Sequence, residues 1–150
     1  MEQTLVLIKP DAIQRGLAGT IIGRFERRGL KIAAMKFMKV SKTLAEQHYG
    51  IHKDKAFFND LVGFITSSPI IAAVFTGNNA VEIVRQSMGN TNSAQAAPGT
   101  IRGDFGLDIQ NNLVHGSDSK ENAVKEINLF FSSDEILEYP MEIERWITGS

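Results

Sequence analysis

The sequence contains no cysteine. Disulfide frameworks, thiolate metal sites and cysteine nucleophiles are therefore excluded, and nothing requires an oxidising compartment. Neither sign of charge is in excess, because 16 basic residues stand against 17 acidic ones, which argues against a protein that coats nucleic acid or an anionic membrane. The first residues lack the basic segment of a signal peptide, and no apolar run is long enough to span a membrane. We expect a cytoplasmic protein with no membrane partner.

The rest of the composition is that of an ordinary globular protein. Hydrophobic residues make up 43% of the chain and charged residues 22%, close to the average for soluble domains. A chain of 150 residues is long enough to bury a sizeable core. Because the sequence has no internal repeat, low-complexity run or linker, we predict a single domain over residues 1–150.

Hydrophobic patterning predicts four strands. Residues 5–8 and 70–75 are continuous apolar runs, typical of strands buried on both faces, and residues 30–40 are largely apolar on both faces. Residues 113–114 form a short fourth strand before a histidine. Apolar stripes at helical spacing, with capping residues and Gly or Pro at their ends, predict helices at approximately 19–28, 43–49, 58–66, 79–88 and 119–131.

The order of these elements predicts the fold class. Without the helical pair at 43–66 it is βαββαβ, the ferredoxin-like pattern. We therefore predict an α+β fold, a ferredoxin-like antiparallel sheet with helices on one face and an inserted helical pair. Residues 90–100 lack periodicity and predict a long ordered loop, which is usually functional. The tail at 135–150 is too apolar for a loose end, so we expect it to pack on the domain or on a neighbouring subunit.

The segment 112–118, Asn-Leu-Val-His-Gly-Ser-Asp, holds the strongest candidate for chemistry. His115 follows a short apolar strand, and neutral imidazole is a nucleophile that needs no strong base beside it. Gly116 would let the backbone come close to the group that His115 attacks. A structural interpretation competes with this one, because Asp118 and Glu121 resemble a helix capping box and His115 could be a core histidine.

Cations, hydroxyls and an amide stand at the ends of several predicted elements. The set is Lys9, Tyr49, Arg85, Thr91, Arg102, Asn112, His115 and Asp118. It suits a polyphosphate, because phosphoryl transfer needs positioning and the neutralisation of spread negative charge. No Gly-x-x-x-x-Gly-Lys-[Ser/Thr] motif occurs, so a P-loop is excluded and side chains must bind the phosphates.

Several further segments form a recognisable pattern between residue 4 and residue 131. They are Ile8-Lys9-Pro10-Asp11, Gln14-Arg15-Gly16, Gln47-His48-Tyr49, Phe57-Phe58, Gly89-Asn90-Thr91-Asn92, Pro98-Gly99-Thr100-Ile101-Arg102-Gly103-Asp104-Phe105, and the segment 112–118. With these segments in this order, the chain resembles the nucleoside diphosphate kinase family. The resemblance implies a ping-pong reaction. The γ-phosphate of a nucleoside triphosphate such as ATP or GTP moves to His115 and then to GDP or another nucleoside diphosphate.

The resemblance also implies roles for the other residues. Lys9, Tyr49 and Asn112 would lie near the transferred phosphoryl group, and Arg85, Thr91 and Arg102 would hold the outer phosphates. Phe57 would stack on the base, a contact that tolerates every base. Mg²⁺ would bridge the phosphates with help from Asp118. Glu126 would orient the imidazole, with Ser117 beside it. A homo-oligomer is implied too, a hexamer or alternatively a tetramer.

Alternatives remain at single residues and for the whole chain. Tyr49 and Phe57 could be core aromatics, and Glu126 a surface carboxylate; His48 and His52 are interpreted as structural or exposed. A catalytically idle nucleotide-binding or partner-binding protein of the same fold is the runner-up. A nucleic-acid-binding regulator is disfavoured by the near-zero net charge.

The chain departs from the family pattern at a few positions. Ser93 stands where the family often has proline, which predicts a modest stability deficit. Gln110-Asn111 replaces a common Gly-Arg pair, and the tail ends differently. We expect these last differences to affect subunit contacts and the outer pocket rather than the chemistry of the histidine.

Overall fold

A computed structural model describes residues 1–149 and contains a four-stranded antiparallel sheet. The strands are β1 (Glu2–Ile8), β2 (Lys31–Met38), β3 (Ile70–Gly77) and β4 (Val114–Gly116), in the spatial order β2-β3-β1-β4. The two central strands are the continuous apolar runs, and each has at least five consecutive buried residues. The long β2 and the short β4 form the edges, so the sheet matches the sequence prediction.

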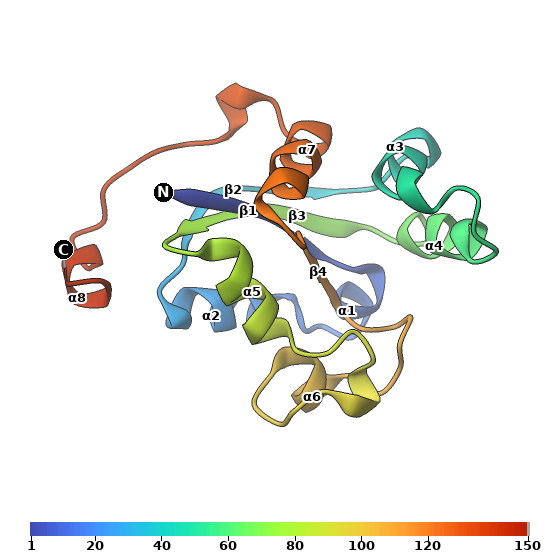
Figure 1. Cartoon of the computed structure of the whole chain (residues 1–150), viewed down its shortest axis with the longest axis horizontal. Helices are drawn as coiled ribbons and strands as arrows, with labels where there is room; N and C mark the ends of the chain where they lie inside the picture. Colours follow the sequence, from blue (N-terminus) through green and yellow to red (C-terminus); the bar gives the residue numbers. More distant parts are fainter. Residues whose placement is uncertain (150) are drawn as a thin grey trace.

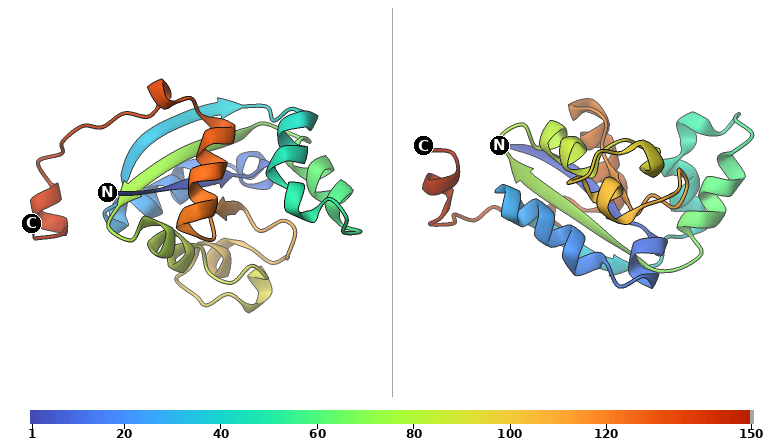
Figure 2. Two further views of the ribbon diagram at one scale, coloured as in Figure 1. Left: turned by 45° about the horizontal axis from the view of Figure 1, so that its top comes forward. Right: turned by 90° about the horizontal axis from the view of Figure 1, so that it is seen from below.

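Helices cover both faces of this sheet (Figures 1 and 2). On one face α2 (Ala18–Arg28) and α5 (Ala80–Met88) pack on Val6 and Ile8 of β1. On the other face α7 (Lys120–Phe130) packs on Leu5 and Leu7 together with the inserted pair, α3 (Lys42–His48) and α4 (Phe58–Ile65). The ferredoxin-like α+β class is confirmed. The expectation that helices lie on one face is correct for α2 and α5 only. Both faces of β1 are apolar, so a second layer of helices buries the other face.

The short elements lie mainly in the connections. They are α1 (Pro10–Gln14), η1 (Gly50–His52), η2 (Ser93–Gln95), α6 (Ile101–Phe105), η3 (Ser133–Glu135) and α8 (Glu144–Ile147). The segment predicted as a loop at 90–100 is a loop that contains η2, and its function stays a prediction. The sequence did not predict α6.

Two local predictions are wrong. The segment Thr43-Leu44-Ala45-Glu46 has the form of a capping box, but Ser41 caps α3, since the Ser41 hydroxyl accepts a hydrogen bond from the Leu44 N–H. The apolar spacing within residues 119–131 predicts that Val124 faces inward, but Val124 is 61% exposed. Spacing alone does not decide which side a residue at the border of an apolar stripe takes.

The tail after η3 runs back along the start of β2, and α8 ends near the N-terminus (Figure 1). Leu137 donates its N–H to the Ala33 carbonyl, and Lys31 forms an ion pair of 2.5 Å with Glu144. The tail therefore packs on the domain as expected, although Trp146 remains 75% exposed. The prediction for the tail extended to Ser150, which lies outside the described residues.

Candidate active site

His115 lies on β4, where the register of the sheet decides which way its ring points. β4 pairs with β1 so that His115 stands opposite Leu7, and Leu7 belongs to the core beneath α3 and α7. Residues directly opposite in an antiparallel pair point to the same face. The imidazole therefore points toward α3 and α7, and its side chain is 26% exposed.

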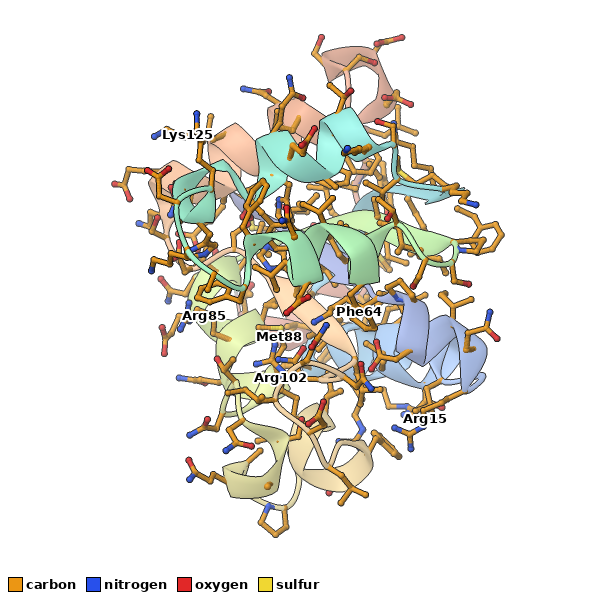
Figure 3. All side chains as sticks on the ribbon, turned by 90° about the vertical axis from the view of Figure 1, so that its right-hand side faces the viewer. Arg15, Phe64, Arg85, Met88, Arg102 and Lys125 are labelled. Carbon is orange, nitrogen blue, oxygen red and sulfur yellow. The ribbon has the colours of Figure 1, made fainter. Side chains whose placement is uncertain are left out.

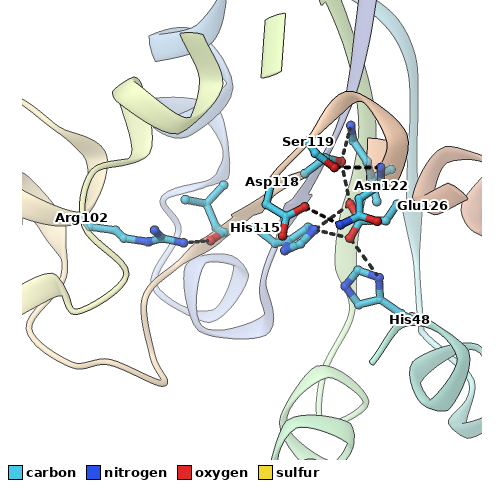
Figure 4. A network of polar contacts seen from close by, with 10 residues as sticks. His48, Arg102, His115, Asp118, Ser119, Asn122 and Glu126 are labelled. Carbon is cyan, nitrogen blue, oxygen red and sulfur yellow. Dashed lines mark hydrogen bonds and ion pairs between the residues drawn. The ribbon is translucent and has the colours of Figure 1, made fainter. Parts of the chain in front are cut away.

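A carboxylate from α7 holds this ring (Figure 4). His115 Nε2 lies 3.0 Å and 3.2 Å from the two carboxylate oxygens of Glu126. The buried Ser117 hydroxyl donates to Glu126 Oε1 at 2.6 Å and accepts a hydrogen bond from the Leu5 N–H at 3.3 Å. Glu126 is thus a partner of the imidazole and not a surface carboxylate, and β1 fixes it through Ser117.

The charge on Glu126 decides which ring nitrogen of His115 carries the proton. Burial raises the pKa of Glu126, but the hydrogen bonds from His115 and Ser117 outweigh it, so the pKa lies below its usual value. The ionised carboxylate can only accept hydrogen bonds. In the neutral ring the proton must then be on Nε2, which leaves the lone pair on Nδ1.

Gly116 is needed for packing in this structure. An added Cβ at Gly116 would lie 2.8 Å from Val84 Cγ1 and 2.9 Å from Met88 Cε. Both side chains belong to α5, which packs under β4 on the face away from the His115 ring. The glycine thus allows α5 to approach the strand. The close approach to a substrate that the sequence suggested stays a prediction.

Lys9 leaves the end of β1 as a nearly buried cation. Its Nζ donates to Asn112 Oδ1 at 2.6 Å and to the Gln110 carbonyl at 3.2 Å. Burial lowers the pKa of Lys9 to about 8; the Asp11 carboxylate opposes this shift and Arg102 adds to it. A desolvated cation beside a second cation favours the binding of an anion, because the anion replaces the lost hydration.

Arg102 is buried and connects the end of α5 to the segment before His115. Its guanidinium donates to the carbonyl oxygens of Gly89, Asn112 and Val114 at 3.0, 3.2 and 2.6 Å. Burial lowers its pKa to about 10, and the nearby Arg85 contributes to the shift. At neutral pH Arg102 is a fixed positive charge that also holds the end of α5 against β4.

The backbone before His115 adopts a strained turn. Leu113 has φ of +77°, and the Val114 N–H donates to the Asn112 carbonyl at 2.9 Å, which closes a γ-turn. The Asp11 carboxylate accepts a hydrogen bond from the Leu113 N–H at 3.0 Å, and the Lys9 N–H donates to the Leu113 carbonyl at 2.9 Å. These contacts stabilise a conformation that a branched residue rarely adopts.

These segments surround a cleft of about 870 Å³. Arg85, Met88 and Arg102, which line it, are labelled in Figure 3. Every residue that the sequence predicted for the site lines the cleft except Ser117, which acts on it through Glu126. The lining set is Lys9, Tyr49, Phe57, Arg85, Thr91, Arg102, Asn112, His115, Asp118 and Glu126.

The two aromatic candidates differ in their surroundings. Phe57 is 45% exposed at the wall of the cleft, so it is not a core residue. Tyr49 packs against the core and also lines the cleft. Burial, followed by the charge of Glu126, raises the pKa of Tyr49 to about 12. Its phenol therefore remains a hydrogen-bond donor at neutral pH.

Comparisons with known proteins identify the family of the chain. The family model "Nucleoside diphosphate kinase" matches residues 2–136. The chain is 56% identical to a nucleoside diphosphate kinase of Pelotomaculum thermopropionicum, covering 98% of this chain and 99% of that protein. It is 55% identical to one of Archaeoglobus fulgidus, covering 98% and 97%. The chain belongs to the nucleoside diphosphate kinase family.

A solved nucleoside diphosphate kinase confirms the fold. The structure from Halobacterium salinarum in complex with CDP has a TM-score of 0.95 and 48% identity, and it covers 97% of each chain. Since the match spans nearly the full length of both proteins, the nucleoside diphosphate kinase fold includes the cleft described above.

In this member of the nucleoside diphosphate kinase family, two residues that contact the segment around His115 were not predicted as functional from the sequence. Asp11 holds the turn before His115, and His48 packs its ring edge-on against His115 at 4.8 Å between centroids. His48 is buried, as a structural interpretation expects, but it also lines the cleft. Only their position in the sequence could have identified these two residues. Each lies close to a predicted site residue and within one of the segments that resemble the family.

Proposed function

We propose that the protein transfers the γ-phosphate of a nucleoside triphosphate to a nucleoside diphosphate through a phosphohistidine on His115. In the first step Nδ1 attacks the γ-phosphorus, the bond to the β–γ bridging oxygen breaks, and the diphosphate leaves with its electron pair. A second nucleoside diphosphate then takes the phosphoryl group in the reverse reaction. The hydrogen bond of His115 Nε2 to Glu126 supports this most directly, because it leaves Nδ1 unprotonated.

The positively charged and neutral polar side chains around the cleft would bind the phosphates. We assign Lys9, Tyr49 and Asn112 to the transferred phosphoryl group and Arg85, Thr91 and Arg102 to the outer phosphates. Lys9 is nearly buried and its charge lacks full hydration, which supports its role. Arg102 already uses three backbone carbonyls, so part of its role is to hold the cleft in shape.

Phe57 would hold the base. Its ring lies at the open edge of the cleft, and stacking depends on a π-face that every base has. Stacking does not depend on the hydrogen-bonding edge of the base. Phe57 therefore supports broad tolerance among ATP, GTP and other nucleotides.

Mg²⁺ is the expected cofactor. Mg²⁺ binds through one or two carboxylates together with substrate phosphates, and the cleft offers Asp118, an exposed carboxylate held by Asn122 Nδ2 at 2.6 Å. Residues and ion fit each other. When bound, Mg²⁺ would neutralise charge on the phosphates, and Asp118 would supply one oxygen ligand.

We also propose that residues 1–150 act as one domain in a homo-oligomer, a hexamer or alternatively a tetramer. Phe37 on the edge strand β2 is 66% exposed, and Trp146 and Ile147 in the tail are 75% and 45% exposed. Exposed apolar groups on an edge strand and in the tail favour association with a second copy. Sedimentation would show a multiple of the 16.5 kDa chain; a monomer would contradict this.

Within residues 1–149 the structure has no helix able to cross a membrane. We propose a cytoplasmic location, which agrees with the absence of cysteine.

Steady-state kinetics test the proposed function. With ATP as donor and GDP as acceptor, double-reciprocal plots at several GDP concentrations should be parallel, as expected for a ping-pong reaction. His115→Ala should remove activity while nucleotide binding remains. Intersecting lines, or an active His115→Ala variant, would contradict the proposal, and binding without turnover would indicate an idle nucleotide-binding protein.

A further inference from the structure

Three possible metal ligands meet at the base of the cleft, from three different elements. His48 comes from the end of α3, His115 from β4 and Glu126 from α7 (Figure 4). His115 Nε2 is 3.0 Å from Glu126 Oε1, and His48 Nδ1 is 3.9 Å from Glu126 Oε2. No two of the three ligand atoms lie more than 4.8 Å apart.

His48 Nδ1 adds a second observation. The side chain is only 2% exposed, and Nδ1 is buried with no hydrogen-bond partner in the part of the chain that the structure describes. A buried nitrogen without a hydrogen-bond partner lowers the stability of the fold unless a ligand or ion binds to it.

We infer that His48, His115 and Glu126 form a binding site for a divalent transition metal, with Zn²⁺ as the expected ion. Two imidazoles and one carboxylate are a common protein ligand set for Zn²⁺, with a fourth position open to water or phosphate. Tetrahedral Zn²⁺ would place its ligand atoms about 3.4 Å apart. Measured to a single carboxylate oxygen, Glu126 Oε2, the present separations are 3.2 Å from His115 Nε2 and 3.9 Å from His48 Nδ1. All three ligand atoms lie within 4.8 Å of one another, so a small movement of the side chains would bring them to this spacing. Mg²⁺ prefers oxygen ligands and would not compete here.

Occupation of this site would stop phosphoryl transfer by changing the tautomer of His115. Zn²⁺ on Nε2 takes the lone pair there, and the proton of the neutral ring moves to Nδ1. The protonated Nδ1 has no lone pair with which to attack phosphorus. This inhibition, unlike the metal site itself, rests on the proposed function.

Metal binding can be measured without nucleotide or activity. Zn²⁺ alone is titrated into chelator-treated protein by calorimetry, and Co²⁺ reports the ligand geometry by its visible absorption. We expect one Zn²⁺ per chain. His48→Gln should weaken binding by more than about 100-fold, since the loss of a direct ligand exceeds the effect of outer-shell changes. The matched control is His52→Gln, which removes a neighbouring cleft histidine outside the cluster and should leave the affinity unchanged.

Two results would overturn the metal site: no Zn²⁺ binding by the wild-type protein, or equal affinity in His48→Gln and the wild type. Imidazole ¹⁵N shifts in the wild-type protein provide a test that needs no folded variant. Zn²⁺ should move the signals of His48 Nδ1 and His115 Nε2 and leave those of His52; unchanged signals at His48 would contradict the site.

Inhibition is tested separately by the labelling of His115 from γ-labelled ATP. With Mg²⁺ in excess, Zn²⁺ should block labelling and a chelator should restore it. Labelling that is unaffected while Zn²⁺ is bound would refute inhibition. If His115 is not labelled even when Zn²⁺ is left out, the proposed function is refuted. Calorimetry would still show whether the metal site exists.

Discussion

At the scale of single residues, Lys9 should make nucleotide binding depend on pH. Its folded pKa is about 8 because the ammonium is buried. The phosphates bind the protonated form of Lys9. The affinity for GDP is therefore at its full value well below pH 8 and decreases as the pH rises above 8, and the decrease approaches tenfold per pH unit. Calorimetry of GDP binding between pH 7 and 9.5 measures this.

The control is Lys9→Met, which should bind GDP more weakly but lose the decline that begins near pH 8. A wild-type affinity that stays constant to pH 9.5 would show that Lys9 does not contact the nucleotide.

The site residues that are charged or nucleophilic could be predicted from the sequence. Residues that affect the site only through packing could not. Lys9, Arg102 and His115 stand at element ends within family segments, and all three line the cleft. His48 was not predicted, because its contacts with His115 and Phe130 depend on how α3 packs against α7. No spacing within the sequence contains that information.

At the scale of elements, the turn at Leu113 should depend on Asp11. Asp11→Ala removes the acceptor of a partly buried N–H, so we expect a loss of about 1–3 kcal/mol in the free energy of unfolding. His115 should also be phosphorylated more slowly, because the strained turn relaxes. Urea denaturation and rapid-quench labelling measure the two effects.

Asp11→Asn is the matched control, since the amide oxygen still accepts a hydrogen bond. It should retain most of the stability and of the labelling rate. Equal losses in the two variants would mean that the charge of Asp11, and not its hydrogen bond, is what matters.

Ser93→Pro should stabilise the loop before α6. Ser93 is the first residue of η2, where proline fits, and the preceding Asn92 has the extended conformation that proline requires. The buried Ser93 hydroxyl also has no hydrogen-bond partner among the described residues. We expect a gain of about 0.4–1 kcal/mol in the free energy of unfolding, seen as a higher melting midpoint. An unchanged or lower midpoint would contradict this.

Elements with a long apolar pattern could be predicted, and so could the short strand β4 before His115, but the short helices in the connections could not. The runs at 5–8 and 70–75 correspond to the central strands because burial on both faces leaves a continuous signal. The helix α6 has only five residues, one of them Gly103, so no stripe develops. Contacts from other segments stabilise it, including the ion pair of Asp104 with Arg24 at 2.7 Å.

At the scale of the whole molecule, His48 should make the fold sensitive to acid. Its pKa is about 3 in the folded protein and 6.5 in the unfolded chain, so the unfolded chain binds one more proton between these values. Stability is therefore full above pH 6.5 and falls as pH decreases, by about 2 kcal/mol between pH 6.5 and 5 from this group alone.

His48→Gln should show a smaller loss over the same range. Urea denaturation at both pH values, in the wild type and the variant, gives the comparison. Equal losses in the two proteins would show that His48 takes up a proton without unfolding.

The central claim is that the Nδ1 atom of His115 receives the phosphoryl group because Glu126 holds Nε2. The most direct test is to label the protein with γ-labelled ATP and Mg²⁺, remove the nucleotide, and locate the phosphoryl group by ³¹P and ¹⁵N NMR. We predict an acid-labile, base-stable phosphohistidine at Nδ1 that is released by GDP and absent from His115→Ala. A phosphoryl group on Nε2 or on another residue, or none in a protein that binds ATP, would contradict the account.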